Sequence, residues 1–237
     1  MTTEAPPRAA AAALSRIDVV SDAICPWCWI GKRHLEGALA RLADEGERFT
    51  ARWHPFQLNP DMPREGVERS AYRAAKFGSI ERSSELDAQV AAAGAAAGLE
   101  FRFDRQRRTP NTVDAHRLIR HAGEIGGASQ QDAVVEGLFR AYFQDGRDIG
   151  DAAVLAEVAS ETGLADAAAF LASGDGAAEV RAEDAGFRRL GISGVPSFAL
   201  AGHVLFSGAV PAERMADAFR RARAILRERG GQEPEAG

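Results

Sequence analysis

The sequence predicts an α/β fold in which a strand–helix–strand unit opens the chain, a long helical block follows, and a strand–strand–helix unit closes it. Segments with strand character lie near the two ends, at 16–21 and 49–56 and again at 197–201 and 203–206. Apolar residues at helical spacing fill nearly the whole of 63–191. The chain has 237 residues, of which 46% are hydrophobic, so it can bury a substantial core.

The opening unit begins with RIDVVS at 16–21, a β-branched run that predicts a buried strand. Through 26–43 apolar residues recur every three or four positions, which indicates a helix. Pro26 suits its first turn, where a missing N–H costs nothing. The alternating segment 49–56 then predicts a second strand. A strand–helix–strand unit of this length favours a right-handed crossover and a parallel pair of strands.

The central block is predicted to be helical nearly throughout, and Asn111 is a candidate cap for the helix that follows it. The expected helices are Arg69–Phe77, Ser84–Gly98, Val113–Ala122, Gln130–Tyr142, Asp151–Thr162, Asp166–Ala172 and Ala177–Leu190.

The closing unit comprises the strands Ser197–Ala201 and His203–Phe206 and an amphipathic helix at Pro211–Arg227. We therefore expect one domain formed by 16–62 and 191–229, and a helical insertion domain at 63–190 whose last helix packs on the sheet. Residues 1–15 and 230–237 are expected to be disordered tails.

Composition excludes several classes of function. The net charge is −5, and lysine occurs only at 32 and 76, so a basic surface for nucleic acid is not indicated. No stretch approaches the roughly 20 apolar residues of a membrane helix, and the first fourteen residues lack the pattern of a secretory signal. A chain with two cysteines fits a reducing compartment. The expected location is therefore the cytoplasm, and a homodimer is possible.

The two cysteines lie in Cys25-Pro26-Trp27-Cys28, between the first strand and its helix. A C-x-x-C pair beside a βαβ pattern is typical of a thioredoxin-like redox motif. The N-terminus of a helix favours the thiolate form of Cys25, which makes it the expected nucleophile. Cys28, one turn further along, is expected to be shielded and to attack the mixed disulfide. Trp27 can offer an apolar surface to substrates, or can simply pack.

Two other interpretations of the cysteines are less consistent with the sequence. A zinc ion would have only two thiolate ligands, and His34 lies too far along the helix to serve as a third, so no metal site is predicted. A pair of buried bystander cysteines is disfavoured by the position after a strand and by Pro26.

Val195-Pro196 stands just before the third strand. An X-Pro bond is where a cis peptide occurs in proteins, and in thioredoxin-fold proteins a cis-proline at this place faces the cysteine pair. We therefore expect Val195 to offer its backbone to a substrate, much as an added strand would.

Several other polar residues are candidates for supporting roles. Asp22 is interpreted as a turn cap in preference to a proton relay, and Asn111 as a helix cap. His54 is interpreted as a strand histidine with a satisfied hydrogen bond, while His116 is left open between a cleft residue and a structural one. Lys32 is expected to be solvated at the surface, and Trp29 to pack.

Four segments in order resemble the DsbA superfamily, and specifically its FrnE-like branch. They are SDAICPWCWIGKRHLEGAL, FQLNPDMPREG, PNTVDAHRLIRHA and GISGVPSF, and the resemblance runs from Ile17 to Arg227. It implies a thioredoxin fold (βαβ…ββα) interrupted by a large all-helical insertion. Some FrnE-like proteins carry a second cysteine pair near the C-terminus, and this chain has none.

The resemblance implies a thiol–disulfide oxidoreductase acting on protein or low-molecular-weight disulfides and thiols, with no cofactor and with glutathione as a possible co-substrate. Related branches are the 2-hydroxychromene-2-carboxylate isomerases and the kappa-class glutathione transferases. They typically have Ser where this chain has Cys25, so a glutathione-dependent isomerase or transferase of a small molecule is the alternative function. A non-catalytic, chaperone-like binder is a third hypothesis.

Overall fold

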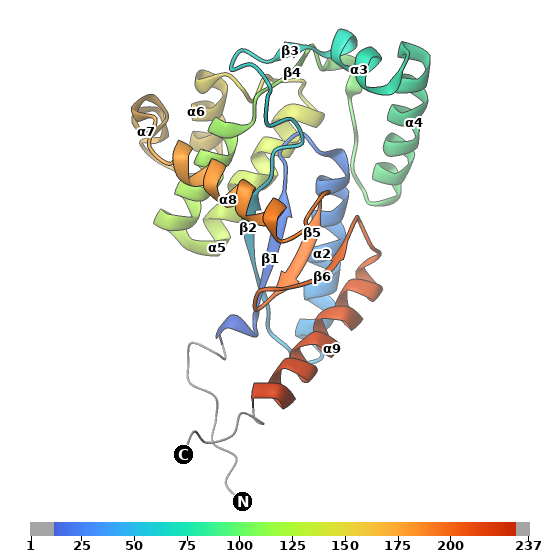
Figure 1. The fold of residues 1–237 in the computed structure, drawn as a ribbon, viewed down its shortest axis with the longest axis vertical. Coiled ribbons are helices and arrows are strands. Elements are labelled where there is room, and N and C mark those ends of the chain that lie inside the picture. Colours follow the sequence, from blue (N-terminus) through green and yellow to red (C-terminus); the bar gives the residue numbers. More distant parts are fainter. Residues whose placement is uncertain (1–11, 231–237) are drawn as a thin grey trace, which may run out of the picture.

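The computed structural model describes residues 12–230 and centres on a four-stranded sheet in the order β2-β1-β5-β6 (Figure 1). Strand β1 (Arg16–Ser21) pairs in parallel with β2 (Thr50–Pro55) and antiparallel with β5 (Ser197–Leu200). Strand β6 (His203–Ser207) pairs antiparallel with β5. The parallel pair and the closing strands predicted from the sequence are confirmed.

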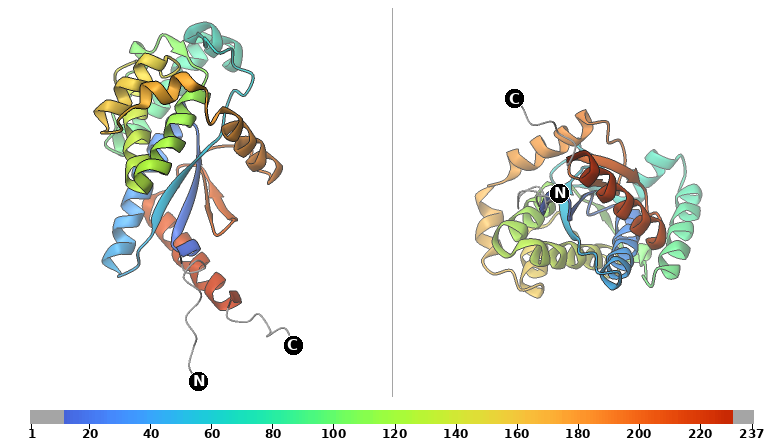
Figure 2. Two further views of the ribbon diagram at one scale, coloured as in Figure 1. Left: turned by 90° about the vertical axis from the view of Figure 1, so that its left-hand side faces the viewer. Right: turned by 90° about the horizontal axis from the view of Figure 1, so that it is seen from below.

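The two faces of the sheet bury different side chains, because successive residues of a strand point to opposite sides. Ile17 and Val19 belong to the main core together with residues of α2 (Pro26–Asp44) and α9 (Ala212–Gly230). Val20, on the other face, packs in a second cluster that also contacts Phe187 of α8 (Ala177–Arg189). Figure 2 shows α8 across the sheet from α2. This is the helix that was expected to pack on the sheet.

Most of the helices belong to the segment between β2 and β5. They are α3 (Arg69–Phe77), α4 (Ile80–Ala96), α5 (Val113–Phe143), α6 (Ala152–Glu161), α7 (Ala167–Ser173) and α8. Helix α5 joins two predicted helices across Gly127, which has the non-helical angles φ 69° and ψ −163°. Its Gln131 carboxamide accepts a hydrogen bond from the Trp53 N–H at 2.9 Å and donates one to the Trp53 carbonyl at 3.1 Å. Helix α5 thereby covers the edge strand β2, which would otherwise present unpaired backbone groups.

The structure departs from the sequence-based expectation in three places. The inserted segment is not all-helical, since β3 (Val67–Glu68) and β4 (Arg108–Thr109) form a small antiparallel ladder, and a 3₁₀ turn spans Phe103–Arg105. Residues 12–15, expected in a disordered tail, form a helical turn whose Ser15 carbonyl accepts from the Thr50 N–H at 2.9 Å. Gly230 is the last residue of α9. The rest of the two expected tails, 1–11 and 231–237, lies outside the described residues.

No helix within residues 12–230 is both long enough and apolar enough to cross a membrane.

Candidate active site

Helix α2 begins directly after Cys25, and Pro26 occupies its first position. Cys25 itself has extended angles (φ −91°, ψ 112°) and makes no side-chain cap. Its N–H donates to the Asp22 carbonyl at 3.0 Å, and its carbonyl accepts from the Cys28 N–H at 3.0 Å. The Cys25 sulfur therefore lies where the unpaired N–H groups of the first turn favour negative charge.

The two thiols differ in their access to solvent and in their electrostatic environment. Cys25 is 5% exposed and lines a cleft, whereas Cys28 is 0% exposed and lies behind it. Burial raises the pKa of the Cys28 thiol well above its ordinary value, and contact with Cys25 raises it further. The Ser21 hydroxyl and the Asp22 amide, which contact Cys28, act in the opposite direction. Cys25 is thus the sulfur that a molecule in the cleft can reach.

The loop before β5 closes on the cysteine pair. The Val195–Pro196 bond is cis, as predicted. The Cys25 thiol donates to the Val195 carbonyl with a distance of 3.7 Å between sulfur and oxygen. Gly31 of α2 permits the close approach of Pro196, because a Cβ at position 31 would lie 2.8 Å from the Pro196 Cγ. The loop and α2 therefore form one continuous wall beside Cys25.

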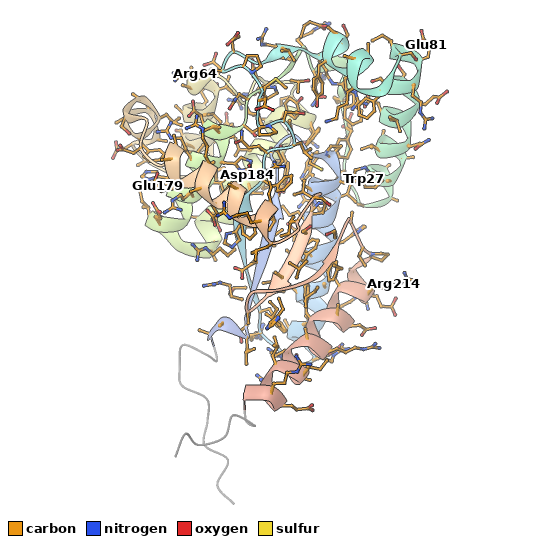
Figure 3. All side chains as sticks on the ribbon, in the orientation of Figure 1. Trp27, Arg64, Glu81, Glu179, Asp184 and Arg214 are labelled. Carbon is orange, nitrogen blue, oxygen red and sulfur yellow. The ribbon has the colours of Figure 1, made fainter. Side chains whose placement is uncertain are left out.

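A cleft of about 380 Å3 separates this wall from the helical segment. Its apolar part includes Trp27, which is 42% exposed and is labelled at the start of α2 in Figure 3. Its charged part is mainly positive. Three basic side chains come from α3, namely Arg69, Arg73 and Lys76, and the one carboxylate is that of Asp87.

The basic side chains are held in place by the helices around them. Asp87 binds Arg69 at 2.7 Å and Arg73 at 2.5 Å. Lys76 donates to the Tyr72 hydroxyl at 2.6 Å, and that hydroxyl donates to Asn59 Oδ1 at 2.6 Å. The Asn59 Nδ2 is buried and has no hydrogen-bond partner among the described residues. The helical side of the cleft thus combines positive charge with an unused amide donor.

These features were compared with known proteins. A family model described as "DSBA-like thioredoxin domain" matches residues 16–220. The chain belongs to this family.

Two individual relatives are each 30% identical to this chain. The uncharacterized protein YwbO of Bacillus subtilis (strain 168) is 30% identical over 156 residues, which are 65% of this chain and 68% of YwbO. The structure is similar to a probable DsbA oxidoreductase from Streptomyces coelicolor, with 30% identity, a TM-score of 0.77, and coverage of 94% of this chain and 92% of that one.

Two more distant structures share the fold alone. The cytosolic disulfide reductase DsbM from Pseudomonas aeruginosa, solved with GSH, is 22% identical with a TM-score of 0.58, over 90% of this chain and 98% of that one. A 2-hydroxychromene-2-carboxylate isomerase is 16% identical with a TM-score of 0.62, over 92% and 100%. The family model alone shows that the chain is DsbA-like, and the FrnE-like branch stays a prediction.

The candidate supporting residues divide between the cysteine pair and other parts of this DsbA-like fold. Asp22 is fully buried, and its Oδ2 accepts from the Leu58 N–H at 2.8 Å, so it ties the loop after β2 to the motif instead of capping its own turn. His116 lies beside it, with 3.3 Å between His116 Nε2 and Asp22 Oδ1. The structure therefore brings these two together behind the cysteines.

His54 and Asn111 have structural partners elsewhere. His54 lies on the α8 face of the sheet, between Asp18 at 2.9 Å and Glu183 at 2.5 Å. Burial alone would lower the pKa of His54, but its hydrogen bonds to these two carboxylates outweigh burial and raise the pKa above its ordinary value. Asn111 was expected to cap α5, but the cap residue is Thr112; Asn111, one residue earlier, accepts at Oδ1 from the Val113 N–H, the first of the helix, at 3.0 Å.

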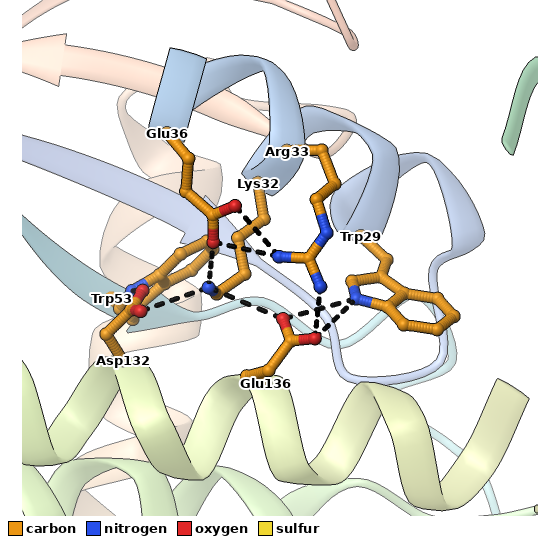
Figure 4. A network of polar contacts seen from close by, with 7 residues as sticks. All are labelled: Trp29, Lys32, Arg33, Glu36, Trp53, Asp132 and Glu136. Carbon is orange, nitrogen blue, oxygen red and sulfur yellow. Dashed lines mark hydrogen bonds and ion pairs between the residues drawn. The ribbon is translucent and has the colours of Figure 1, made fainter. Parts of the chain in front are cut away.

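The sequence suggested that Lys32 is solvated at the surface, and this prediction is wrong. Lys32 is 2% exposed and lies at the centre of an ion network between α2 and α5 (Figure 4). Its ammonium lies 2.5 Å from Glu36, 3.0 Å from Asp132 and 3.4 Å from Glu136. The partners from α5 are about a hundred residues away, so no local pattern reveals them. The indole of Trp29 donates to Glu136 in the same network. Trp29 is buried, and the prediction that it packs is confirmed.

The wall of α3 was also missed at the sequence level, although a signal was present. Arg69, Arg73 and Lys76 are spaced by four and three residues, which places them on one face of the predicted helix. As to metals, the described part of the chain holds no group of three or more His, Cys, Asp or Glu side chains suited to an ion. His34 instead lies 3.0 Å from the carbonyl of Val210.

Proposed function

We propose that this DsbA-like protein catalyses thiol–disulfide exchange through Cys25 and Cys28. The observation that carries the proposal is the asymmetry of the pair. One sulfur lines a cleft at a helix N-terminus, and the other is fully buried behind it. A thiolate at the first position is both a nucleophile and a good leaving group.

In the proposed mechanism Cys25 attacks a substrate disulfide and forms a mixed disulfide, releasing the first substrate thiol. Cys28 then attacks the Cys25 sulfur, which releases the second thiol and leaves a Cys25–Cys28 disulfide. Two electrons pass from the protein dithiol to the substrate. The same steps in reverse oxidise a substrate dithiol.

The cleft suits a substrate that is partly apolar and negatively charged. Its volume of about 380 Å3 lies in the range of small-molecule sites. Its α3 wall offers positive charge for a carboxylate, and the Val195 backbone offers strand-like hydrogen bonds to a peptide. We infer that the substrates are protein disulfides and anionic low-molecular-weight thiols such as glutathione. We also propose a reducing compartment, the cytoplasm, as the place of action, because the chain carries only two cysteines.

The basic cleft also favours one alternative, a glutathione-dependent isomerase or transferase of a small molecule. In that reaction a bound thiol does the chemistry, so the resolving cysteine is dispensable. The two functions therefore differ in what happens when Cys28 is removed.

The test is a single-turnover reaction of the fully reduced protein with one equivalent of a peptide disulfide, followed by acid trapping and mass spectrometry. Wild type is expected to consume the disulfide and to end with an internal disulfide. Cys28→Ala should stop as a peptide adduct on Cys25, and Cys25→Ala should not react. Wild type that leaves the peptide disulfide intact would contradict the proposal. Glutathione-dependent isomerisation retained in Cys28→Ala would move the alternative to first place.

A further inference from the structure

The cleft beside Cys25 carries a mostly buried positive charge that the protein itself does not neutralise. Arg69 and Arg73 of α3 share one carboxylate, that of Asp87 on α4, at 2.7 Å and 2.5 Å. The exposed fractions of the three side chains are 14%, 17% and 16%, and neither arginine has a second carboxylate partner within residues 12–230. Burial lowers the pKa of the Arg73 guanidinium, and the charge of Arg69 lowers it further, while Asp87 acts in the opposite direction. Two guanidinium groups with one counter-ion are suited to bind a second anion.

The two arginines differ in how far their donors are already used. Arg73 donates to Asp87 and to both the hydroxyl and the carbonyl of Ser83, so it fastens α3 to α4. Arg69 donates to Asp87 through Nη2 only, and its side chain has no other hydrogen bond to a described residue. Its guanidinium lies 5.3 Å from the centre of the Phe103 ring. Arg69 therefore keeps Nε and Nη1 for a ligand, and a guanidinium presents its N–H groups in the geometry that a carboxylate accepts.

Most of the remaining lining of the cleft is apolar. Figure 1 shows α3 and α4 beside the end of α2 at which the cysteines lie. Aromatic and aliphatic side chains from these helices and from the loops between them face the cleft, among them Ile24, Leu58, Phe77, Val90 and Phe143. An apolar chain gains free energy when it leaves water for such a surface. Arg69, the apolar lining and Cys25 can therefore contact three parts of one ligand, namely a carboxylate, a chain and a sulfur.

The same cleft offers no partner to an ammonium group. Asp87 is the only carboxylate among the described residues that line it, and each of its two oxygens binds an arginine. An ammonium in the cleft would therefore be unpaired, and the arginines and Lys76 would repel it. Cysteine and glutathione carry an ammonium beside one of their carboxylates. The charges of the cleft thus favour an anionic ligand that lacks this group.

We propose that the low-molecular-weight substrate of this cleft is a dithiol, or the corresponding cyclic disulfide, on an apolar chain that ends in a carboxylate and carries no ammonium. This inference rests on the proposed thiol–disulfide exchange and narrows its small substrates. Arg69 binds the carboxylate, the apolar lining holds the chain, and Cys25 meets the sulfur. Arg73 and Asp87 position Arg69 and do not touch the reacting atoms.

The reaction with such a dithiol balances without a further reactant. One thiol of the ligand loses its proton to solvent and attacks Cys25 Sγ, and the Cys25–Cys28 bond breaks. Cys28 leaves as a thiolate and takes up a proton from solvent. The second thiol of the ligand loses its proton and attacks the ligand sulfur bonded to Cys25, which closes the ligand's own disulfide and releases the Cys25 thiolate. Two electrons pass from the ligand to the protein, and the reverse steps oxidise the protein.

The test measures reduction of the oxidised full-length protein by dihydrolipoate and by dihydrolipoamide. The two reagents carry the same dithiol on the same chain and differ only in the end group, a carboxylate or a neutral amide. Samples are quenched in acid at timed intervals, their thiols are trapped, and the reduced fraction is read by mass spectrometry. The variant is Arg69→Gln, in which Asp87 still has Arg73 as a partner. The control is Arg82→Gln, which changes the net charge equally at a 55% exposed residue outside the cleft.

We expect dihydrolipoate to reduce the wild-type protein at least about tenfold faster than dihydrolipoamide does, because hydrogen bonds between charged groups are among the stronger ones. Arg69→Gln should lose most of this preference, and Arg82→Gln should keep it. Equal rates with the two reagents in wild type would overturn the inference. An Arg69→Gln protein that keeps the whole preference would overturn it as well.

A second measurement needs only the wild-type protein, so it decides the matter if Arg69→Gln does not fold, and it also tests the exclusion of an ammonium. Octanoate, octanamide and 2-aminooctanoate share one chain and contain no sulfur. Each is added to the reduced protein before iodoacetamide, and octanoate should protect Cys25 from alkylation more than either of the others. Octanoate that protects no better than octanamide would contradict the carboxylate subsite. Equal protection by 2-aminooctanoate would contradict the exclusion of the ammonium.

Failure of the proposed function has a different signature from failure of this inference. If a peptide dithiol reduces the Cys25–Cys28 disulfide while dihydrolipoate has no advantage over its amide, the exchange chemistry stands and only the inference falls. If neither reagent nor the peptide dithiol reduces the disulfide, the exchange function itself fails.

Discussion

The ion network around Lys32 makes a quantitative prediction for the stability of the contact between α2 and α5. Lys32→Met keeps the aliphatic stem but leaves Glu36, Asp132 and Glu136 without their shared cation. Breaking a fully buried ion pair costs about 3–5 kcal/mol. Here Lys32 is 2% exposed while its three partners are 44%, 41% and 22% exposed, so solvent screens the carboxylates that remain, and Arg33 still pairs with Glu36 and Glu136. We therefore expect a loss of about 2 kcal/mol in the free energy of unfolding.

The assay is urea unfolding of wild type and Lys32→Met, followed by the fluorescence of the three tryptophans, of which Trp29 and Trp53 are buried. In thermal unfolding the same loss lowers Tm by about 4–8 °C for a chain of this size. Arg82→Met is the matched control, because the Arg82–Glu85 pair is 55% and 62% exposed; it should cost less than about 0.5 kcal/mol.

The pH dependence of this loss has a defined sign. Burial raises the pKa of Glu36, but Lys32 and Arg33 outweigh burial and lower it overall. The stability that Glu36 gains from the network is therefore present above its unfolded pKa and is lost as the pH falls through the folded value. The difference between wild type and Lys32→Met should shrink in acid. A Lys32→Met protein within 0.5 kcal/mol of wild type at neutral pH would refute the reasoning.

Three further predictions concern the sheet, the cis-proline loop and the cysteines. Because the pKa of His54 is raised above its ordinary value of 6.5, its charge stabilises the fold below that value and is lost as the pH rises through the folded pKa. His54→Gln should therefore destabilise more at about pH 6 than at about pH 9 in urea unfolding, and an equal effect at both would contradict this. Gly31→Ala should lower the free energy of unfolding by about 1–3 kcal/mol and slow disulfide exchange, because the new Cβ would lie 2.8 Å from Pro196 Cγ. The control is Gly186→Ala, whose Cβ would have its nearest contact at 3.8 Å and which should not slow exchange. Iodoacetamide on the native reduced protein should leave Cys28 unmodified in peptide maps; equal labelling of both thiols would show that Cys28 is not shielded.

The elements that lie close together in sequence could be predicted, because local patterns determine them. The cysteines after a strand, Pro26 in the first helical turn, and Pro196 before a strand each carry a local signal. The order of strands and helices along the chain followed from the alternation of strand and helix periods. The Val195–Pro196 bond is cis, as this placement predicted.

What the sequence did not reveal depends on residues far apart along the chain. Lys32 was expected in solvent because its anionic partners on α5 lie beyond any helical window. The ladder of β3 and β4 has two residues per strand, too few for an alternating pattern to appear. His116 was left undecided, since only the packing of α5 on the sheet brings it to Asp22.

The sequence predicted two helices, Val113–Ala122 and Gln130–Tyr142, and the structure has its break between them, at Gly127 within α5. What was not predicted is that Gln131, just beyond the break, covers the edge of β2. Glycine takes a positive φ at little cost, which permits the break.

The measurement that tests the central claim most directly is a redox titration of the wild-type protein in glutathione buffers of graded potential. Each sample is quenched in acid, its thiols are trapped, and the products are identified by mass. We expect one reversible two-electron transition from two free thiols to a single Cys25–Cys28 disulfide. Two thiols that stay free across the whole range, or a glutathione adduct on Cys25 as the only oxidised species, would contradict the assignment of the pair as a dithiol–disulfide centre.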